Sequence, residues 1–267
     1  MQGRLSPPID GFIQRFPMSS WQSEFYIASE LGLKKIEWTV DFSTFYQHPI
    51  VDPSKYLETK GILEDSGIVA NSVTCDFFMQ ANPFSSGKLE DLKGMFRSLF
   101  TSSSLSDGSI LVVPLVDAGA PKSDADWVKA INFFKTLVQI MPERGLTIAF
   151  EMEVSPALQA TFIRSLDSSH FGINFDMGNS AALGFDPSNE IYIIQEFIQN
   201  VHIKDRLLGG GTVPMGTGHT DFLKVGETLK AIGYEGDMIL QCARQPLKSE
   251  KETISHYIDF CREVGLT

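Results

Sequence analysis

The sequence predicts one α/β domain, a closed (β/α)8 barrel, and three observations support that prediction. Stretches of helical pattern end on glycine and are followed at once by β-rich apolar runs, as in ELGLKKIEWTV and ERGLTIAFEM. Strands that alternate with helices form parallel sheets, because parallel strands need a crossover connection. Seven clear strand-helix units in 267 residues, without a linker-like break, favour a single domain over residues 1–267 whose sheet closes on itself.

The first strand is the shortest of the predicted elements. Only MQGRL precedes the turn at Pro7 and Pro8, and it carries little apolar length. We therefore expect a strand of about three to five residues. It should close the barrel beside the last strand, DMILQ.

The remaining strands are short apolar runs, and amphipathic segments of helical length separate them. One such segment is DADWVKAINFFKTLVQIMPERG, and the last, KSEKETISHYIDFCREVG, has the single apolar stripe of an outer helix. Glycines such as Gly67 and Gly145 stand where a helix end favours a left-handed residue. In chain order the runs are KKIEWTV, GIVANSVTC, SILVVPLV, LTIAFEM, FGINFD, QNVHIKD and DMILQ.

An open, doubly wound sheet is the alternative architecture. It would use a glycine-rich phosphate-binding turn after a strand, but no G-x-G-x-x-G follows any predicted strand. The glycine-rich segment GGGTVPMGTG opens no clear nucleotide-binding helix. The sequence therefore favours the closed barrel.

The composition argues against several kinds of partner. A net charge of −11 and a pI near 4.9 disfavour nucleic acid or an anionic membrane as the main ligand, because both need a basic face. Cys75, Cys242 and Cys261 lie far apart and form no C-x-x-C pair, which indicates buried thiols in a reducing compartment. No apolar run approaches the roughly 18 residues of a membrane span, and MQGRLSPPID lacks the apolar core of a signal peptide. We expect a cytoplasmic protein.

Alternation along the strands predicts which polar side chains enter the barrel. In FGINFD the bulky Ile173 and Phe175 face outward. Asn174 and Asp176 therefore point inward, with Asp176 at the C-terminal end of its strand, where barrel active sites form. The same alternation places polar side chains from three other strands on this rim: Glu151, His202 and Gln241.

Taken singly, each of these residues has an ordinary structural explanation. An acidic residue at a strand end is commonly a helix N-cap, and a strand histidine is commonly part of the core. Two carboxylates, an imidazole and an amide at one level are costly to bury unless a cation compensates them. Mixed oxygen and imidazole ligands favour one Mn²⁺ or Mg²⁺ ion, with Co²⁺ or Zn²⁺ as alternatives. The predicted metal ligands are Glu151, Asp176, His202 and Gln241.

Several motifs together carry a family resemblance over nearly the whole chain. They are GRLSP, FEMEVSP, FDMGN, VHIKDR, and VPMGTGHTDF leading into IGYEGDMILQ. In this combination the sequence resembles the xylose isomerase-like TIM-barrel superfamily of sugar and sugar-phosphate isomerases and epimerases (AP endonuclease family 2-like). The resemblance implies that Glu151, Asp176 and His202 hold the metal, and that Glu151 is also a base acting next to a carbonyl or hydroxyl carbon.

The resemblance also suggests residues that touch the substrate. Asn179 occupies the position of a substrate-contacting polar residue in the pattern that begins at Asp176. Lys204 would act in catalysis by meeting a phosphate or a developing oxyanion, and a structural ion pair with Glu153 is the alternative. The other predicted substrate contacts are Glu37, Trp38 and Arg206.

The chain departs from the family pattern at Gln241. The resembling proteins have a glutamate there, which serves as fourth metal ligand and second base. An amide oxygen still binds a metal, but it cannot abstract a proton. Epimerisation with one carboxylate on each face of the substrate would lose one base, whereas reactions that need one base remain open, among them aldose-ketose isomerisation and dehydration of a keto-polyol.

Three classes of function therefore stay open. The favoured one is a metal-dependent isomerase or epimerase of a sugar or sugar phosphate, working through an enediolate next to a carbonyl. The others are a dehydratase or lyase on a keto-polyol or cyclitol, and a sugar-binding protein without catalysis. The DNA-repair endonuclease branch is disfavoured, because it needs many histidines and the chain has five. We expect a homodimer or homotetramer.

Overall fold

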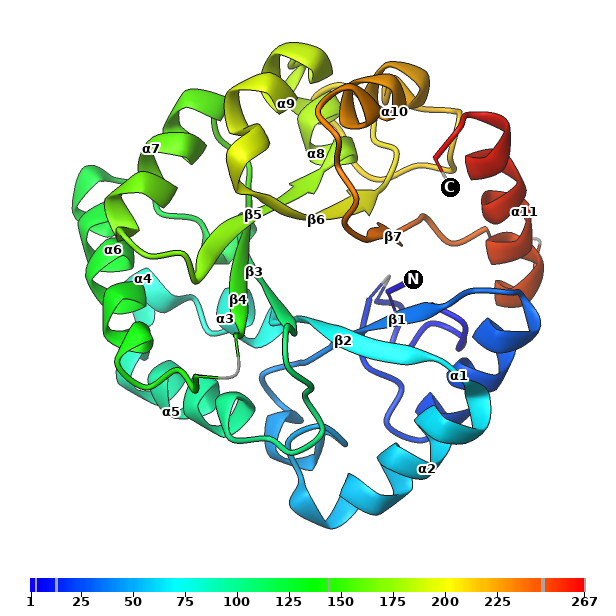
Figure 1. Ribbon diagram of the computed structural model, residues 1–267, viewed down its shortest axis with the longest axis horizontal. Helices are drawn as coiled ribbons and strands as arrows, with labels where there is room; N and C mark the ends of the chain where they lie inside the picture. The colour runs from blue at the N-terminus through cyan, green and yellow to red at the C-terminus, as the bar shows by residue number, and fades with distance from the viewer. Residues whose placement is uncertain (3, 13, 144, 246–247, 267) are drawn as a thin grey trace.

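The computed structural model describes residues 1–267 except residues 3, 13, 144, 246–247 and 267. Within these residues, seven parallel strands form one sheet in which each strand pairs with the next along the chain. The sheet curls round a common axis and the helices lie outside it (Figure 1). The strands are β1 (Lys35–Thr39), β2 (Val69–Thr74), β3 (Ile110–Leu115), β4 (Thr147–Met152), β5 (Phe171–Asp176), β6 (Ile198–Ile203) and β7 (Met238–Leu240).

The N-terminal residues close the gap between β7 and β1. The backbone N–H of Gln2 donates to Leu240 O at 3.0 Å, and that of Glu37 donates to Met1 O at 2.8 Å. Gln2 and Glu37 form a parallel bridge, so the predicted closure beside DMILQ is confirmed. Among the described residues, which do not include Gly3 of the predicted strand, the contact is a bridge rather than the expected strand of about three to five residues. The amides of Leu5 and Ser6 turn away to the Glu24 carboxylate.

The helices follow the predicted alternation. Helix α2 ends at Gly67, whose φ of +66° is a left-handed conformation that glycine adopts without strain. Among the described residues, no helix has the length and apolar character needed to cross a bilayer. The helices are α1 (Trp21–Glu30), α2 (Tyr56–Ser66), α3 (Asp76–Gln80), α4 (Pro83–Ser86), α5 (Leu89–Phe100), α6 (Asp124–Val138), α7 (Pro156–Leu166), α8 (Met177–Leu183), α9 (Pro187–Ile194), α10 (Phe222–Ala231) and α11 (Glu250–Glu263).

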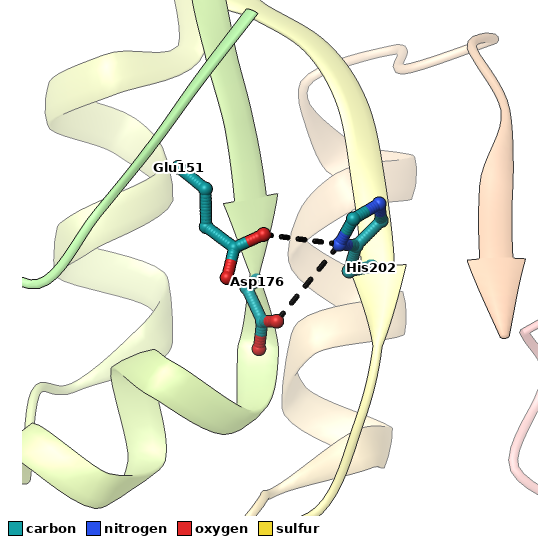
Figure 2. A group of neighbouring side chains, drawn as sticks. All are labelled: Glu151, Asp176 and His202. Atoms are coloured by element: carbon teal, nitrogen blue, oxygen red, sulfur yellow. Dashed lines mark ion pairs between the residues drawn. The ribbon is translucent and has the colours of Figure 1, made fainter. Parts of the chain in front are cut away.

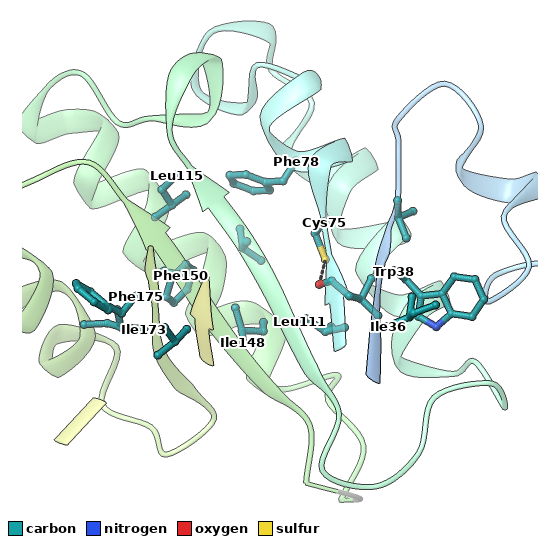
Figure 3. Packing of buried hydrophobic residues seen from close by; sticks show 14 of the residues in the cluster. Ile36, Trp38, Cys75, Phe78, Leu111, Leu115, Ile148, Phe150, Ile173 and Phe175 are labelled. Carbon is teal, nitrogen blue, oxygen red and sulfur yellow. Dashed lines mark hydrogen bonds between the residues drawn. The ribbon is translucent and has the colours of Figure 1, made fainter. Parts of the chain in front are cut away.

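The hydrophobic core lies between the sheet and the helices. Outward-facing strand residues such as Ile148, Phe150 and Ile173 belong to it, and Figure 3 shows several of them together. The opposite face of the strands carries polar side chains in β1, β5 and β6, including Glu37, Asn174 and His202. The hydrophobic effect on the outer face thus fixes the orientation of the polar residues inside the barrel.

Candidate metal centre

Asp176 ends strand β5 and caps helix α8, and this junction fixes its carboxylate. Oδ1 accepts the backbone N–H of Asn179 at 2.9 Å. The other oxygen, Oδ2, lies 2.7 Å from Lys204 Nζ, and the strand register pairs Asp176 with His202 of β6. The helix cap therefore uses one oxygen and leaves the other directed at the neighbouring strand.

Glu151, Asp176 and His202 come together at the C-terminal end of the barrel (Figure 2). His202 Nδ1 lies 3.2 Å from Glu151 Oε2 and 4.0 Å from Asp176 Oδ2. One ligand atom from each residue lies within 4.8 Å of the others, and all three side chains are buried. Ligands that share one divalent ion lie about 3–4 Å apart, so small side-chain rotations would complete a common site.

Two oxygens at this rim are buried without a hydrogen-bond partner in the described part of the chain: Asp176 Oδ2 and Gln241 Oε1. Lys204 forms an ion pair with Asp176 Oδ2 but donates no hydrogen bond to it. Gln241 follows β7, and its backbone N–H donates to Ile203 O at 3.0 Å, which places it beside the end of β6. Unsatisfied buried oxygens are costly without a ligand. Together with the imidazole, they form a donor set that fits Mn²⁺ or Mg²⁺.

Glu37 lies behind His202 and orients its ring. Its Oε1 is 2.8 Å from His202 Nε2, so the other ring nitrogen, Nδ1, faces Glu151 and Asp176. Glu37 is 0% exposed, which puts it out of reach of a substrate. The predicted substrate contact is therefore replaced by a carboxylate-histidine pair, an arrangement that tunes metal-binding histidines. Glu37 also accepts hydrogen bonds from Gln2, Ser72, Thr74 and Asn200.

The charges at the centre keep the carboxylates ionised. Burial raises the pKa of Glu151, but Lys204, His202 and Asn179 outweigh it and lower that pKa to about 2. Burial likewise raises the pKa of Glu37, and the charge and hydrogen bond of His202 bring it below its ordinary value. Both carboxyl groups are therefore ionised at neutral pH and can accept hydrogen bonds or protons.

Metal binding is expected to tighten by about tenfold per pH unit between about pH 6 and pH 8. Burial lowers the pKa of His202, but Glu37 and Glu151 raise it to about 10, so below that pH a bound ion must displace a proton from Nδ1. Calorimetry with Mn²⁺ in buffers of different ionisation enthalpy should detect about one proton released per ion. An affinity that does not change with pH would show that ion binding displaces no proton from His202.

Asn179 links Glu151 to the two cationic side chains Lys204 and Arg206. Its Nδ2 donates to Glu151 Oε1 at 2.8 Å. Its Oδ1 accepts from Arg206 Nη1 at 2.7 Å and from Lys204 Nζ at 3.4 Å. The predicted substrate contacts Asn179 and Arg206 thus lie together next to Glu151.

Lys204 pairs with Asp176, which corrects the alternative pairing with Glu153. Glu153 instead accepts from Arg206 Nη1 at 2.5 Å. Gly178 explains the glycine in FDMGN, because a Cβ there would lie 2.8 Å from the Lys204 side chain. Without that glycine, Lys204 could not pass over the first turn of α8 to reach Asp176.

Trp38 lies on the outer face of β1, opposite Glu37. It is 2% exposed and packs against the rings of Phe16, Trp21 and Phe25. Its indole N–H donates to Ala70 O at 3.3 Å. The structure therefore places Trp38 in the hydrophobic core, away from the metal centre.

Two charged residues that the sequence analysis did not single out lie at the same rim. Arg4 is 4% exposed and donates to Cys242 O, next to Gln241. Asp76 is also 4% exposed, and the charge of Glu151 acts on it. The position of Asp76 directly after the predicted strand GIVANSVTC could have indicated it, whereas no sequence pattern indicates a role for Arg4.

Comparison with known proteins gives a family match and a partial relative. The model of the xylose isomerase-like TIM-barrel family matches residues 25–264. An inosose dehydratase of Geobacillus thermodenitrificans is 24% identical over 160 residues, which is 50% of this chain and 52% of that protein. The chain spans about half the length of the curated relatives it matches.

Solved structures of similar fold cover nearly the whole chain. A D-psicose 3-epimerase, solved in the presence of D-fructose, has a TM-score of 0.74 at 12% identity, covering 94% of this chain and 96% of its own. A Mycobacterium smegmatis xylose isomerase-like TIM-barrel protein in complex with magnesium has a TM-score of 0.69 at 18% identity, covering 96% and 91%. At these identities the likeness is one of fold.

Proposed function

The chain belongs to the xylose isomerase-like TIM-barrel family, and on that premise we propose that it is a metal-dependent isomerase or epimerase of a sugar or sugar phosphate. The observation that carries the proposal is the convergence of Glu151, Asp176 and His202, which are buried at the C-terminal end of the barrel. Gln241 adds, at the same rim, an oxygen that has no hydrogen-bond partner among the described residues. Such a donor set suits one divalent ion, with Mn²⁺ or Mg²⁺ favoured.

Glu151 is the proposed base. Its lowered pKa keeps it ionised at neutral pH, and hydrogen bonds from Asn174 and Asn179 hold its two oxygens in place. A carbon-bound proton next to a substrate carbonyl would pass to this carboxylate. A bound divalent ion would polarise that carbonyl and stabilise negative charge on its oxygen.

The cationic side chains would position the substrate oxygens. Lys204 and Arg206 both reach Asn179, so their positive charge lies close to the base. Developing negative charge on a substrate oxygen, or the phosphate of a sugar phosphate, would be stabilised there. Because Glu153 occupies one Arg206 nitrogen, a phosphate would have to compete with that carboxylate.

The test is turnover with defined sugars. Protein loaded with Mn²⁺ is incubated with ketoses, ketose phosphates and aldoses, and products are identified by NMR, with chelated protein as the control. Conversion that depends on the metal supports the proposal. If no sugar is converted and no carbon-bound hydrogen exchanges with solvent deuterium, the protein is not such an enzyme.

A dehydratase acting on a keto-polyol or cyclitol is the second candidate. Two observations favour it: Gln241 cannot serve as a base, and one partial relative is an inosose dehydratase. Dehydration needs one proton acceptor and loses water, so a product lighter by one water in the mass spectrum separates it from isomerisation.

Gln241→Glu is expected to tighten Mn²⁺ binding roughly tenfold to a hundredfold. It adds a full negative charge at an oxygen that is buried and has no hydrogen-bond partner among the described residues, beside the end of β6. Titration with Mn²⁺ measures the change, and Gln245→Glu, a half-buried glutamine four residues on, serves as the control. Equal affinities of the variant and the natural protein would place Gln241 outside the coordination sphere.

A further inference from the structure

Asp76 lies two residues beyond the end of strand β2, where helix α3 begins, and is buried. Ser72 and Thr74, two and four residues earlier in the chain, both donate to the buried Glu37 inside the barrel. Cys75 (φ −87°, ψ 61°) leaves the extended conformation, and Asp76 begins helix α3 directly beyond the C-terminal end of β2. A backbone hydrogen bond from Cys75 N to Val112 O at 2.8 Å continues the pairing of β2 with β3 up to this point.

Asp76 and the proposed base Glu151 lie at the same end of the barrel. Thr74 pairs with Val112 of β3, and two residues further along β3 Pro114 pairs with Glu151 of β4. Asp76 follows Thr74 by two residues at this end of the sheet, and the charge of Glu151 acts on its carboxyl group. The two carboxyl groups therefore lie at the same rim of the barrel, Glu151 in β4 and Asp76 at the start of α3.

Asp76 is buried, and few hydrogen bonds hold its side chain in place. Among the described residues, the only hydrogen bond to its side chain comes from Gln14 Nε2, 2.8 Å from Oδ2. Burial and the charges of Asp41 and Glu151, opposed by Gln14 and Arg4, together raise its pKa to about 7. Asp41 is itself held by the Phe16 amide and Gln80. Near neutral pH, Asp76 can thus hold a proton or release it.

A chain of polar contacts connects Asp76 to the Gln241 side of the rim. Gln14, which binds Asp76, accepts from Arg4 Nη2 at 2.9 Å, and Arg4 Nη1 donates to Cys242 O. Arg4 Nε and Gln241 Oε1 are both buried without a hydrogen-bond partner in the described part of the chain. Unsatisfied buried groups of this kind are expected where a polar ligand binds.

We propose that Asp76 is the second proton-transfer residue of this site, acting on the face of the sugar opposite to Glu151 and in place of the base that Gln241 cannot supply. This inference rests on the proposed epimerase function. Glu151 takes the carbon-bound proton, and the C–H electron pair becomes the double bond of an enediolate. Protonated Asp76 then gives its proton to the same carbon from the other face, and the double-bond pair forms the new C–H bond. Exchange with water afterwards returns a proton to Asp76 and removes one from Glu151.

Asp76→Asn in D₂O separates the two steps. With Mn²⁺ and the sugar that the natural protein converts, the variant should lose epimer formation by about 10²- to 10⁴-fold. It should still wash deuterium into the starting sugar at that carbon, because Glu151 remains active. Asp91→Asn, on the exposed first turn of α5, is the matched control. Mn²⁺ titration and thermal unfolding confirm that the Asp76 variant is folded and loaded, and Asp76→Glu should restore part of the epimer formation.

The outcomes distinguish the two proposals. If the natural protein converts no sugar and exchanges no carbon-bound hydrogen, the proposed epimerase function is wrong, and the proposed role of Asp76 is wrong with it. If the natural protein is active and Asp76→Asn forms the epimer at the same rate, only the role of Asp76 is overturned. Loss of both epimer formation and exchange in a folded, Mn²⁺-loaded variant would also overturn it, because Asp76 would then be needed before the second proton transfer.

Discussion

Glu151→Gln is expected to lower turnover by about 10³-fold or more on any sugar that the natural protein converts. The substitution removes the carboxylate that we propose accepts the proton, and it also removes one of the three groups that could hold a metal ion. The new amide nitrogen would face Asn174 and Asn179, whose side-chain N–H groups now donate to the two carboxylate oxygens. Turnover should therefore fall for two reasons, the loss of the proposed proton acceptor and the loss of a proposed metal ligand.

The measurement is kcat under saturating Mn²⁺, together with the Mn²⁺ affinity. Glu196→Gln makes the same change in an exposed ion pair with Arg164 and should leave both values unchanged. If Glu151→Gln retains turnover within about tenfold of the natural protein, another group must remove the proton, and the assignment of Glu151 as base is wrong.

Glu37→Gln is expected to lower the free energy of unfolding by about 3–5 kcal/mol. Glu37 is fully buried and is the anion that pairs with His202 Nε2, so its loss leaves the imidazole without its charge partner. Because that pairing raises the pKa of His202, its stabilisation is present below the ordinary histidine pKa and is lost as the pH rises through about 10. The loss of stability should therefore be largest near pH 6 and shrink in alkaline buffer.

Urea denaturation at several pH values tests this expectation, with Glu196→Gln again as the control. The Mn²⁺ affinity should also fall by about tenfold to a hundredfold, since the carboxylate fixes the ring nitrogen that faces the metal. A variant with normal stability and normal Mn²⁺ affinity would show that Ser72, Thr74 and Asn200 hold the site without the charge of Glu37.

The sequence by itself determined the barrel, the family and the rim on which the centre lies. Glycine-ended helices alternate with apolar strands, and a strand whose bulky residues face the core must turn its other residues inward. That rule placed Glu151, Asp176 and His202 together without knowledge of any distance. It succeeds because side-chain direction along a strand is a local property.

Only the tertiary structure decided what each inward residue contacts. Glu37 lies behind His202, 165 residues away in the chain, and Lys204 pairs with Asp176 instead of Glu153. The closure at Gln2 and the contact of Asp76 with Gln14 likewise depend on contacts between distant segments. Local sequence fixes which face a residue occupies, whereas its partner depends on the register between strands and the shape of the closed barrel, which the whole chain sets together.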